Sequence, residues 1–159
     1  MSASSVSQKV IVRKVTRKLI ADALLLIGEY YDEIGVILRD STEDILHYVD
    51  DPESGIWIAY VGAMPAGCVV LRPLAARPHC GEVKRLYVRR AFRRMGIAHA
   101  LMQALEAEAK TRATQWLYLD TKDDLSDAIR IYEQQGYVSC ERYNNNPQAT
   151  LFLRKFLCC

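Results

Sequence analysis

The stretch 82–98 constrains the fold of this chain more than any other, because its hydrophobic period changes at a glycine. Before Gly96, β-branched and aromatic side chains are dense, which predicts a strand over about 80–89. After it, Ile97 and Leu101 recur at a spacing of four, the period of an amphipathic helix. The chain therefore passes from a strand through a tight turn into a helix.

This turn has the properties of an anion site. The first N–H groups of a helix have no partner within the helix, and the macrodipole favours an anion there by about 0.3–1 kcal/mol. Gly96 has no Cβ, so a ligand can approach the backbone closely. Four arginines flank the turn and offer donors suited to phosphate oxygens; they are Arg89, Arg90, Arg93 and Arg94. The alternative is an ordinary surface loop whose arginines are solvated.

Two blocks of the chain resemble the GNAT superfamily of N-acetyltransferases. The first reads Glu-Val-Lys-Arg-Leu-Tyr-Val over 82–88 and Arg-x-x-Gly-x-Ala over 93–98, and it is similar to the coenzyme A motif of that family. The second reads Ala-Ile-Arg-Ile-Tyr-Glu-Gln-Gln-Gly-Tyr over 128–137 and is similar to a later family segment. The resemblance implies direct transfer of an acetyl group from acetyl-CoA, as cosubstrate, to a primary amine of a small molecule or peptide.

The expected fold class is α/β, a single-domain GNAT-like fold whose mixed, mostly antiparallel sheet has about six or seven strands and helices on both faces. A length of 159 residues suits one domain. We expect a flexible tail over 1–7, which is small and polar, and one N-acetyltransferase domain over 8–159. The predicted strands are 10–15, 56–61, 67–71, 80–89, 116–119, 137–143 and 150–156, and the predicted helices are 19–34, 41–49, 97 onward and 124–135.

Glu82 is the candidate base. Acetyl transfer to an amine requires removal of a proton, because an alkyl amine is almost wholly protonated at pH 7. The resemblance to the histone-acetylating branch of the family implies this role for Glu82, and the period of a strand places it on one sheet face with Lys84 and Leu86, unless a β-bulge alters that facing. The alternative is a solvated carboxylate at a strand end, paired with Lys84 or Arg85.

Tyr132 is the candidate acid. The resemblance implies that its phenol protonates the departing sulfur of coenzyme A. Leu125, Ala128 and Ile129 precede it at helical spacing, so the alternative is a core tyrosine with a satisfied hydroxyl.

The resemblance also implies the cofactor contacts. The N–H of Val88 would polarise the thioester carbonyl, the pantetheine arm would pair with the strand at 86–88, and the pyrophosphate would bind main-chain N–H groups over 94–98. Arg94 stands where many relatives carry glycine, so we expect the turn to avoid a left-handed conformation there. Leu125 replaces a common asparagine. The cofactor-binding residues implied in this way are Leu86, Tyr87, Val88, Arg93, Arg94, Met95, Gly96, Ile97 and Ala98.

The acceptor groove is expected between the first helices and the last strands, again by resemblance. Acidic residues there could receive a cationic amine, and Tyr143 and Asn146 could donate hydrogen bonds to a small polar acceptor. The predicted substrate-binding residues are Tyr31, Glu33, Tyr143 and Asn146. The alternative for each is a turn or a solvated helix end.

Composition limits the other classes. A net charge of +2 is too small for a general nucleic-acid binder. The five cysteines are odd in number and lack a zinc pattern, which favours a reducing compartment, and the longest apolar run, 23–28, is too short to span a bilayer. We therefore expect a cytoplasmic protein with no metal and no membrane partner, while a homodimer stays open. The alternative functions are a non-catalytic acyl-CoA binding or sensing module, and an interaction protein whose arginines contact nucleic acid.

Overall fold

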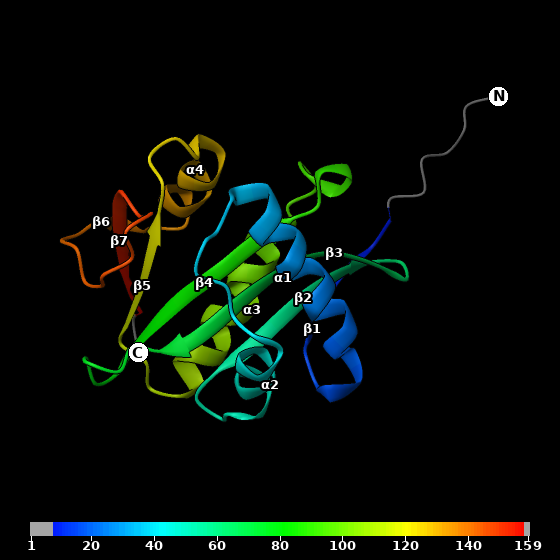
Figure 1. Cartoon of the computed structure of the whole chain (residues 1–159), viewed down its shortest axis with the longest axis horizontal. Coiled ribbons are helices and arrows are strands. Elements are labelled where there is room, and N and C mark those ends of the chain that lie inside the picture. Colours follow the sequence, from blue (N-terminus) through cyan, green and yellow to red (C-terminus); the bar gives the residue numbers. More distant parts are fainter. Residues whose placement is uncertain (1–7, 158–159) are drawn as a thin grey trace.

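The computed structural model describes residues 8–157, so the tail expected over 1–7 and the last two cysteines lie outside the described residues. The described chain forms one seven-stranded sheet with the order β1-β2-β3-β4-β5-β7-β6 (Figure 1). The elements are β1 (Val10–Lys14), the 3-10 turn η1 (Arg17–Leu19), α1 (Ile20–Ile34), α2 (Thr42–Asp50), β2 (Gly55–Val61), β3 (Met64–Pro73), β4 (Cys80–Val88), the 3-10 turn η2 (Arg90–Phe92), α3 (Ile97–Thr111), β5 (Trp116–Thr121), α4 (Ser126–Gln134), β6 (Val138–Ser139) and β7 (Leu151–Phe156).

The predicted mixed, mostly antiparallel sheet is confirmed. Every neighbouring pair of strands is antiparallel except β4 and β5, which run parallel. Between these two strands the chain crosses over through α3, as a parallel connection requires. The strand-turn-helix unit expected over 82–98 therefore lies at the centre of the sheet.

Helices cover both faces of the sheet, as predicted. Leu101 and Leu105 of α3 are fully buried in the core of one face, to which α4 also contributes. Leu26 and Ile27 of α1, with Ile45 of α2, are buried in the core of the other face. Each fully buried leucine or isoleucine stabilises the fold by about 1.5–3 kcal/mol. The central strands β2 and β3 lie between these two cores, which explains their continuous apolar runs.

The two parallel strands diverge after a short ladder. The pairing between β4 and β5 extends only from Cys80 with Trp116 to Glu82 with Tyr118. Beyond Glu82, β4 continues to Val88 without a strand on that side within residues 8–157. This leaves an open edge of β4 that faces the end of β5.

A β-bulge changes the facing of β4 at Arg85. The ladder with β3 pairs Val70 with Lys84 but Cys68 with Tyr87, so β4 carries one extra residue there. Arg85 has a φ of 58°, in the left-handed region. As a result Lys84 and Arg85, although consecutive, both line the same pocket, whereas Leu86 packs against the core on the α3 face. Leu86 therefore does not share a face with Glu82, because the β-bulge that the sequence allows in this strand is present and alters the facing.

The strand predicted over 137–143 is much shorter in the structure. Only β6 forms in this stretch. One further main-chain hydrogen bond to β7 follows it, donated by Cys140 N to Phe152 O over 2.8 Å. After Cys140 the chain turns toward β4, because Tyr143 and Asn144 donate hydrogen bonds to Glu82. Within residues 8–157 no helix has the length and hydropathy needed to cross a bilayer.

Candidate functional site

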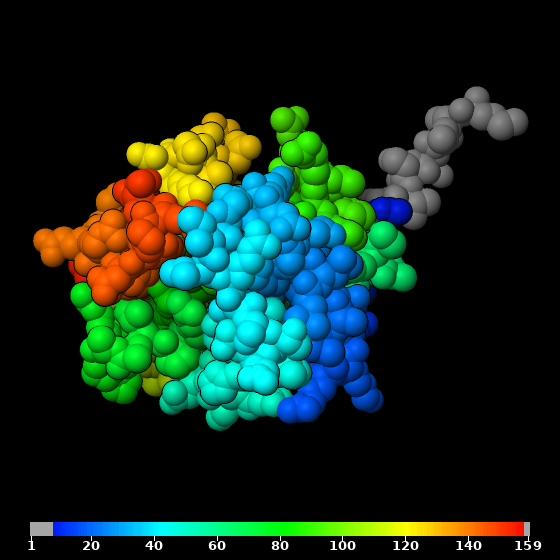
Figure 2. Space-filling view, viewed as in Figure 1, coloured from blue at the N-terminus to red at the C-terminus, as the bar shows by residue number. Residues whose placement is uncertain are grey.

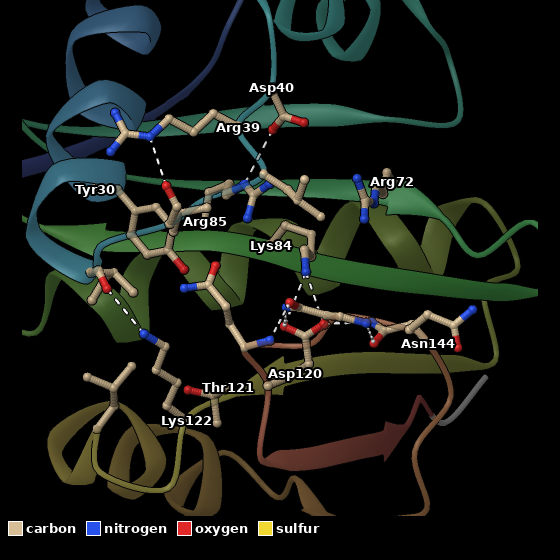
Figure 3. A pocket seen from close by; sticks show the side chains of 18 residues that line it. Tyr30, Arg39, Asp40, Arg72, Lys84, Arg85, Asp120, Thr121, Lys122 and Asn144 are labelled. Carbon is tan, nitrogen blue, oxygen red and sulfur yellow. Dashed lines mark hydrogen bonds and ion pairs between the residues drawn. The ribbon is translucent and has the colours of Figure 1, made fainter.

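A pocket of about 360 Å³ lies where β4 and β5 diverge (Figure 3). The connection between α1 and α2 forms one wall, and the segment between β6 and β7 forms another. In the space-filling view these two segments, light blue to cyan and orange to red, lie next to each other (Figure 2). Gln148 joins them, because its side chain accepts from Ile37 N and donates to Gly35 O, both over 3.0 Å. The pocket is therefore walled by segments more than 100 residues apart in the sequence.

A buried ion pair crosses the opening between the strands. Lys84 Nζ of β4 lies 3.1 Å from Asp120 Oδ2 of β5, and both side chains are less than 10% exposed. Asn144 also donates to Asp120, over 2.6 Å. Burial acts to raise the pKa of Asp120, but the charge of Lys84 and these hydrogen bonds outweigh it and hold that pKa below its usual value. Asp120 is thus a charged acceptor that lines the pocket.

Glu82 lies beside this pair but is enclosed by its own partners. Its carboxylate accepts from Arg72 Nε over 2.8 Å, from the Tyr143 hydroxyl over 2.7 Å and from Asn144 over 3.1 Å. Its side chain is 3% exposed and does not line the pocket, whereas Asn144 and Arg72 do. The alternative of a solvated carboxylate paired with Lys84 or Arg85 is therefore wrong, because the neighbouring strand and the last loop enclose the group.

Asp40, which follows α1, is the acceptor on the opposite wall. Tyr31 donates to its Oδ2 over 2.7 Å and Tyr48 to its Oδ1 over 3.1 Å, while Arg85 Nε approaches Oδ2 at 3.3 Å. Arg72 in turn donates to the Tyr48 hydroxyl over 3.0 Å. A continuous set of hydrogen bonds therefore runs from Arg85 through Asp40 to the partners of Glu82.

Tyr132 of α4 belongs to the core on the α3 face of the sheet. Its side chain is buried, and its ring packs edge-on against Tyr137 with centroids 6.0 Å apart. Tyr132 is thus a core tyrosine, as the alternative holds, but its hydroxyl makes no hydrogen bond to any residue between 8 and 157. Burial raises the pKa of Tyr132 above its usual value, and the negative charge of Asp120 adds to this effect. The phenol thus stays protonated well into alkaline solution.

The open edge of β4 directs main-chain groups into the gap between β4 and β5 that begins after Glu82. Arg89 N donates to Ala66 O over 2.8 Å, and the register pairs Gly67 with Val88. Because hydrogen-bonded pairs alternate along an antiparallel ladder, the main-chain groups of Val88 point away from β3. The carbonyl of Val88 accepts from Arg93 Nε over 2.9 Å, and its N–H is directed into the opening.

The turn before α3 has two residues in the left-handed region. Gly96, the N-cap of α3, has a φ of 76° and provides no capping side chain, so it leaves the N–H groups of the first helical turn accessible. Arg94 has a φ of 66°, so the expectation that the turn avoids a left-handed conformation at this position is wrong. The chain reverses within a few residues between η2 and α3, and this requires positive φ at a residue with a Cβ at a cost of about 1–2 kcal/mol. The other members of this predicted loop, Met95, Ile97 and Ala98, lie between and after these two positions.

The arginines around this turn are partly neutralised by α1. Arg93 lies 2.8 Å from Glu33, and Arg89 lies 2.8 Å from Glu29. The carboxylates of α1 thereby hold the loop in place. They also reduce the cationic character of the surface that the nucleic-acid alternative requires.

The four residues predicted to bind the acceptor lie in different places. Asn146 lines the pocket and approaches Asp120 at 3.4 Å. Tyr31 and Tyr143 do not line the pocket. Tyr31 donates a hydrogen bond to Asp40, and Tyr143 donates one to Glu82. Glu33 is outside the pocket in its pair with Arg93. The structure thus brings together three of the four around one polar network.

Sequence reasoning missed several residues of this site. Asp120 and Asp40 were not singled out, and Lys84, Arg85 and Arg72 were not assigned to the site. Asp120 could have been found from the sequence, because it directly follows the apolar run 116–119 and so lies at the end of a predicted strand. Among the described residues, no group of three His, Cys, Asp or Glu side chains is arranged to hold a metal ion.

Comparisons with known proteins agree with this architecture. Residues 25–137 match the family model described as Acetyltransferase (GNAT) family. An uncharacterized N-acetyltransferase from Schizosaccharomyces pombe is 30% identical over 132 residues, which is 79% of this chain and 80% of that protein. The crystal structure of a GNAT-family acetyltransferase from Staphylococcus aureus has a TM-score of 0.81 at 17% identity, covering 94% of this chain and 100% of that one. A putative acetyltransferase from Salmonella typhimurium, solved with acetyl-CoA, has a TM-score of 0.77 at 13% identity and 94% coverage of both chains.

Proposed function

Because the chain belongs to the GNAT family of acetyltransferases, we propose that it transfers the acetyl group of acetyl-CoA directly to a primary amine of a small molecule or peptide. The observation that carries this proposal is the open edge of β4 beside the pocket. It supplies unpaired main-chain groups where β4 and β5 separate, next to the buried carboxylates of Glu82 and Asp120.

The chain has the groups that acetyl-CoA requires. The edge at Leu86, Tyr87 and Val88 can pair with an extended amide-containing arm as a further strand would. The N–H of Val88 is available to stabilise the oxyanion that forms on the thioester carbonyl. The pyrophosphate would bind main-chain N–H groups from Arg94 to Ala98, where the N-cap leaves them uncovered.

Tyr132 is the proposed acid. Its hydroxyl is free of protein partners among residues 8–157, and its raised pKa keeps the proton on the phenol at neutral pH. The conjugate thiol of the departing thiolate has a pKa near 8.5, below that of a phenol, which is near 10. The thiolate therefore accepts a proton from the phenol only when the two are held close together.

Glu82 is the proposed base, acting through water. Its carboxylate is enclosed by Arg72, Tyr143 and Asn144, so the proton from the amine must cross at least one intermediate position. Asp120 is a second candidate, because it lines the pocket directly. The lowered pKa of Asp120 makes it a weak base, so it is less suited to take the proton from the amine.

Glu82→Gln should lower kcat by about tenfold to a hundredfold, because an amide cannot accept the proton. The loss should be largest near pH 7, where most of the amine is protonated, and smaller near pH 9. The measurement is kcat from pH 6 to 9, with the thermal midpoint recorded because Arg72 loses a charged partner. Glu53→Gln, an exposed substitution, is the matched control. Near-wild-type turnover at every pH would remove Glu82 as the base.

The proposed function is tested by incubating the protein with acetyl-CoA and a panel of primary amines. The product should be followed by mass, since the five cysteines of the chain would react with a thiol reagent. Acetylated product that depends on both reactants supports the enzyme. Protection by acetyl-CoA in a thermal shift without product from any amine would instead support the alternative of a non-catalytic acyl-CoA binding or sensing module.

A further inference from the structure

The pocket has more cationic than anionic side chains. Two carboxylates line it, Asp40 and Asp120. Five cationic side chains do so, and they are Arg39, Arg72, Lys84, Arg85 and Lys122. Lys84 is balanced by Asp120, but Lys122 Nζ donates to a main-chain carbonyl, that of Ile34, over 3.2 Å. Arg39, Arg72 and Arg85 also have carboxylate partners, which are Asp32, Glu82 and Asp40. Lys122 therefore adds the one charge of this set that has no carboxylate partner among residues 8–157, and this slight cationic excess disfavours a cationic acceptor with no other charged group.

Arg85 is the most constrained of these cations. The bulge turns it into the pocket, where its side chain is 10% exposed and its guanidinium packs over the ring of Tyr31, 5.0 Å from the centroid. Figure 3 shows it directed toward Asp40, while the preceding Lys84 points to Asp120 on the other wall. Nε donates to Asp40, and the Tyr30 hydroxyl is the other hydrogen-bond partner of the guanidinium among residues 8–157, so Nη1 and Nη2 have no carboxylate acceptor there. A guanidinium has five donors in a planar fork that matches a carboxylate.

Arg72 adds a further donor to the same pocket. Its Nε and Nη1 are used by Glu82 and the Tyr48 hydroxyl, whereas Nη2 makes no hydrogen bond to the described residues. Its side chain is one-third exposed. The two arginines are linked through Tyr48 and Asp40, so their positions are fixed relative to each other.

We propose that the acceptor amine carries a carboxylate, and that Arg85, assisted by Arg72, binds it. The acceptor class is therefore amino acids and related small amines with a carboxylate, a refinement that rests on the proposed acetyl transfer. Lys122, whose charge has no carboxylate partner among residues 8–157, would also serve the chemistry, because like charge disfavours the ammonium form of the acceptor and so lowers the pKa of its amine in the pocket. This effect supplies more of the neutral nucleophile without a strong base.

The first test compares acceptors that differ only in this charge. Each of several α-, β- and γ-amino acids is paired with the carboxamide of the same skeleton, and kcat/KM is measured for both by product mass. We expect the acid to exceed its amide by about tenfold to a hundredfold for at least one skeleton, since a charge-assisted hydrogen bond to a buried arginine is lost in the amide. Amides that react as well as or better than every acid would overturn the inference.

The second test uses Arg85→Gln and Arg85→Lys. For the preferred skeleton, Arg85→Gln should bring the ratio of acid to amide close to one, mainly through KM of the acid, and Arg85→Lys should retain part of the preference because it keeps the charge without the fork. Arg13→Gln, on the exposed side of β1, is the control and should keep the wild-type ratio. Equal loss for acid and amide in Arg85→Gln would show a structural role only.

If Arg85→Gln does not fold, the wild-type ratio still decides the inference. Absence of product from every acid and amide, with acetyl-CoA bound, would contradict the proposed function instead. In that case thermal shifts of the wild-type protein with coenzyme A and each acid or amide decide the binding site: acids should raise the midpoint more than amides, and equal shifts would overturn the carboxylate site.

Discussion

Tyr132→Phe should lower kcat by about 10²–10⁴-fold and leave the Kd for acetyl-CoA within about twofold of the wild type. The substitution removes only a hydroxyl that has no hydrogen-bond partner in the described structure, so folding loses little. The departing thiolate then lacks its proton donor. Rapid-mixing kinetics and calorimetry separate the two quantities.

The control is Tyr137→Phe, because that ring packs against Tyr132 and its hydroxyl donates to Glu106 over 3.1 Å. It should reduce stability while leaving the chemical step nearly intact. The pH profile is a further check: burial raises the pKa of Tyr132 above its usual value near 10, so kcat should not fall as the pH approaches 10. Equal loss of turnover and acetyl-CoA affinity in Tyr132→Phe would contradict the role of the phenol as an acid.

Asp120→Asn should lower the free energy of unfolding by about 3–5 kcal/mol, because it leaves the buried charge of Lys84 without a partner. The double variant Lys84→Met with Asp120→Leu should be clearly less destabilised than Asp120→Asn, since it removes both charges together. Urea unfolding at neutral pH measures both. If the double variant is the less stable of the two, the cost comes from lost packing and not from an unpaired charge.

The same pair predicts a pH dependence of stability. The pKa of Asp120 lies below its ordinary value near 3.9, so its contribution is complete above that pH and is lost as the pH falls through the folded-state pKa. The wild type should therefore lose stability below about pH 4 more steeply than Asp120→Asn does. Parallel curves for the two proteins would show that Asp120 ionises in the same way in the folded and unfolded states.

Much of the architecture could be predicted because its signals are local. The change of period at Gly96 depends on neighbouring residues, and so does the helix that contains Tyr132. The strand expected over 137–143 could not be corrected in this way. Its end is decided by hydrogen bonds from Tyr143 and Asn144 to Glu82, some 60 residues earlier in the chain.

The site was predicted less completely for the same physical reason. No local pattern indicates that Lys84 meets Asp120, or that a bulge brings Arg85 into the pocket beside Lys84. Glu33 was chosen for its charge and its place on α1, but the arginines of the turn before α3 pair with that charge. Charge alone therefore indicates that a residue will find a partner, and only the fold decides which one.

The most direct test of the central claim is the rate at which acetylated product forms from acetyl-CoA and a primary amine, measured by mass with the wild-type protein and with Tyr132→Phe. We predict turnover that requires both reactants and falls by at least about a hundredfold in the variant. A wild-type protein that binds acetyl-CoA and acetylates none of the amines, carboxylated or not, would contradict the claim that the open edge of β4 directs a thioester to an acceptor nitrogen.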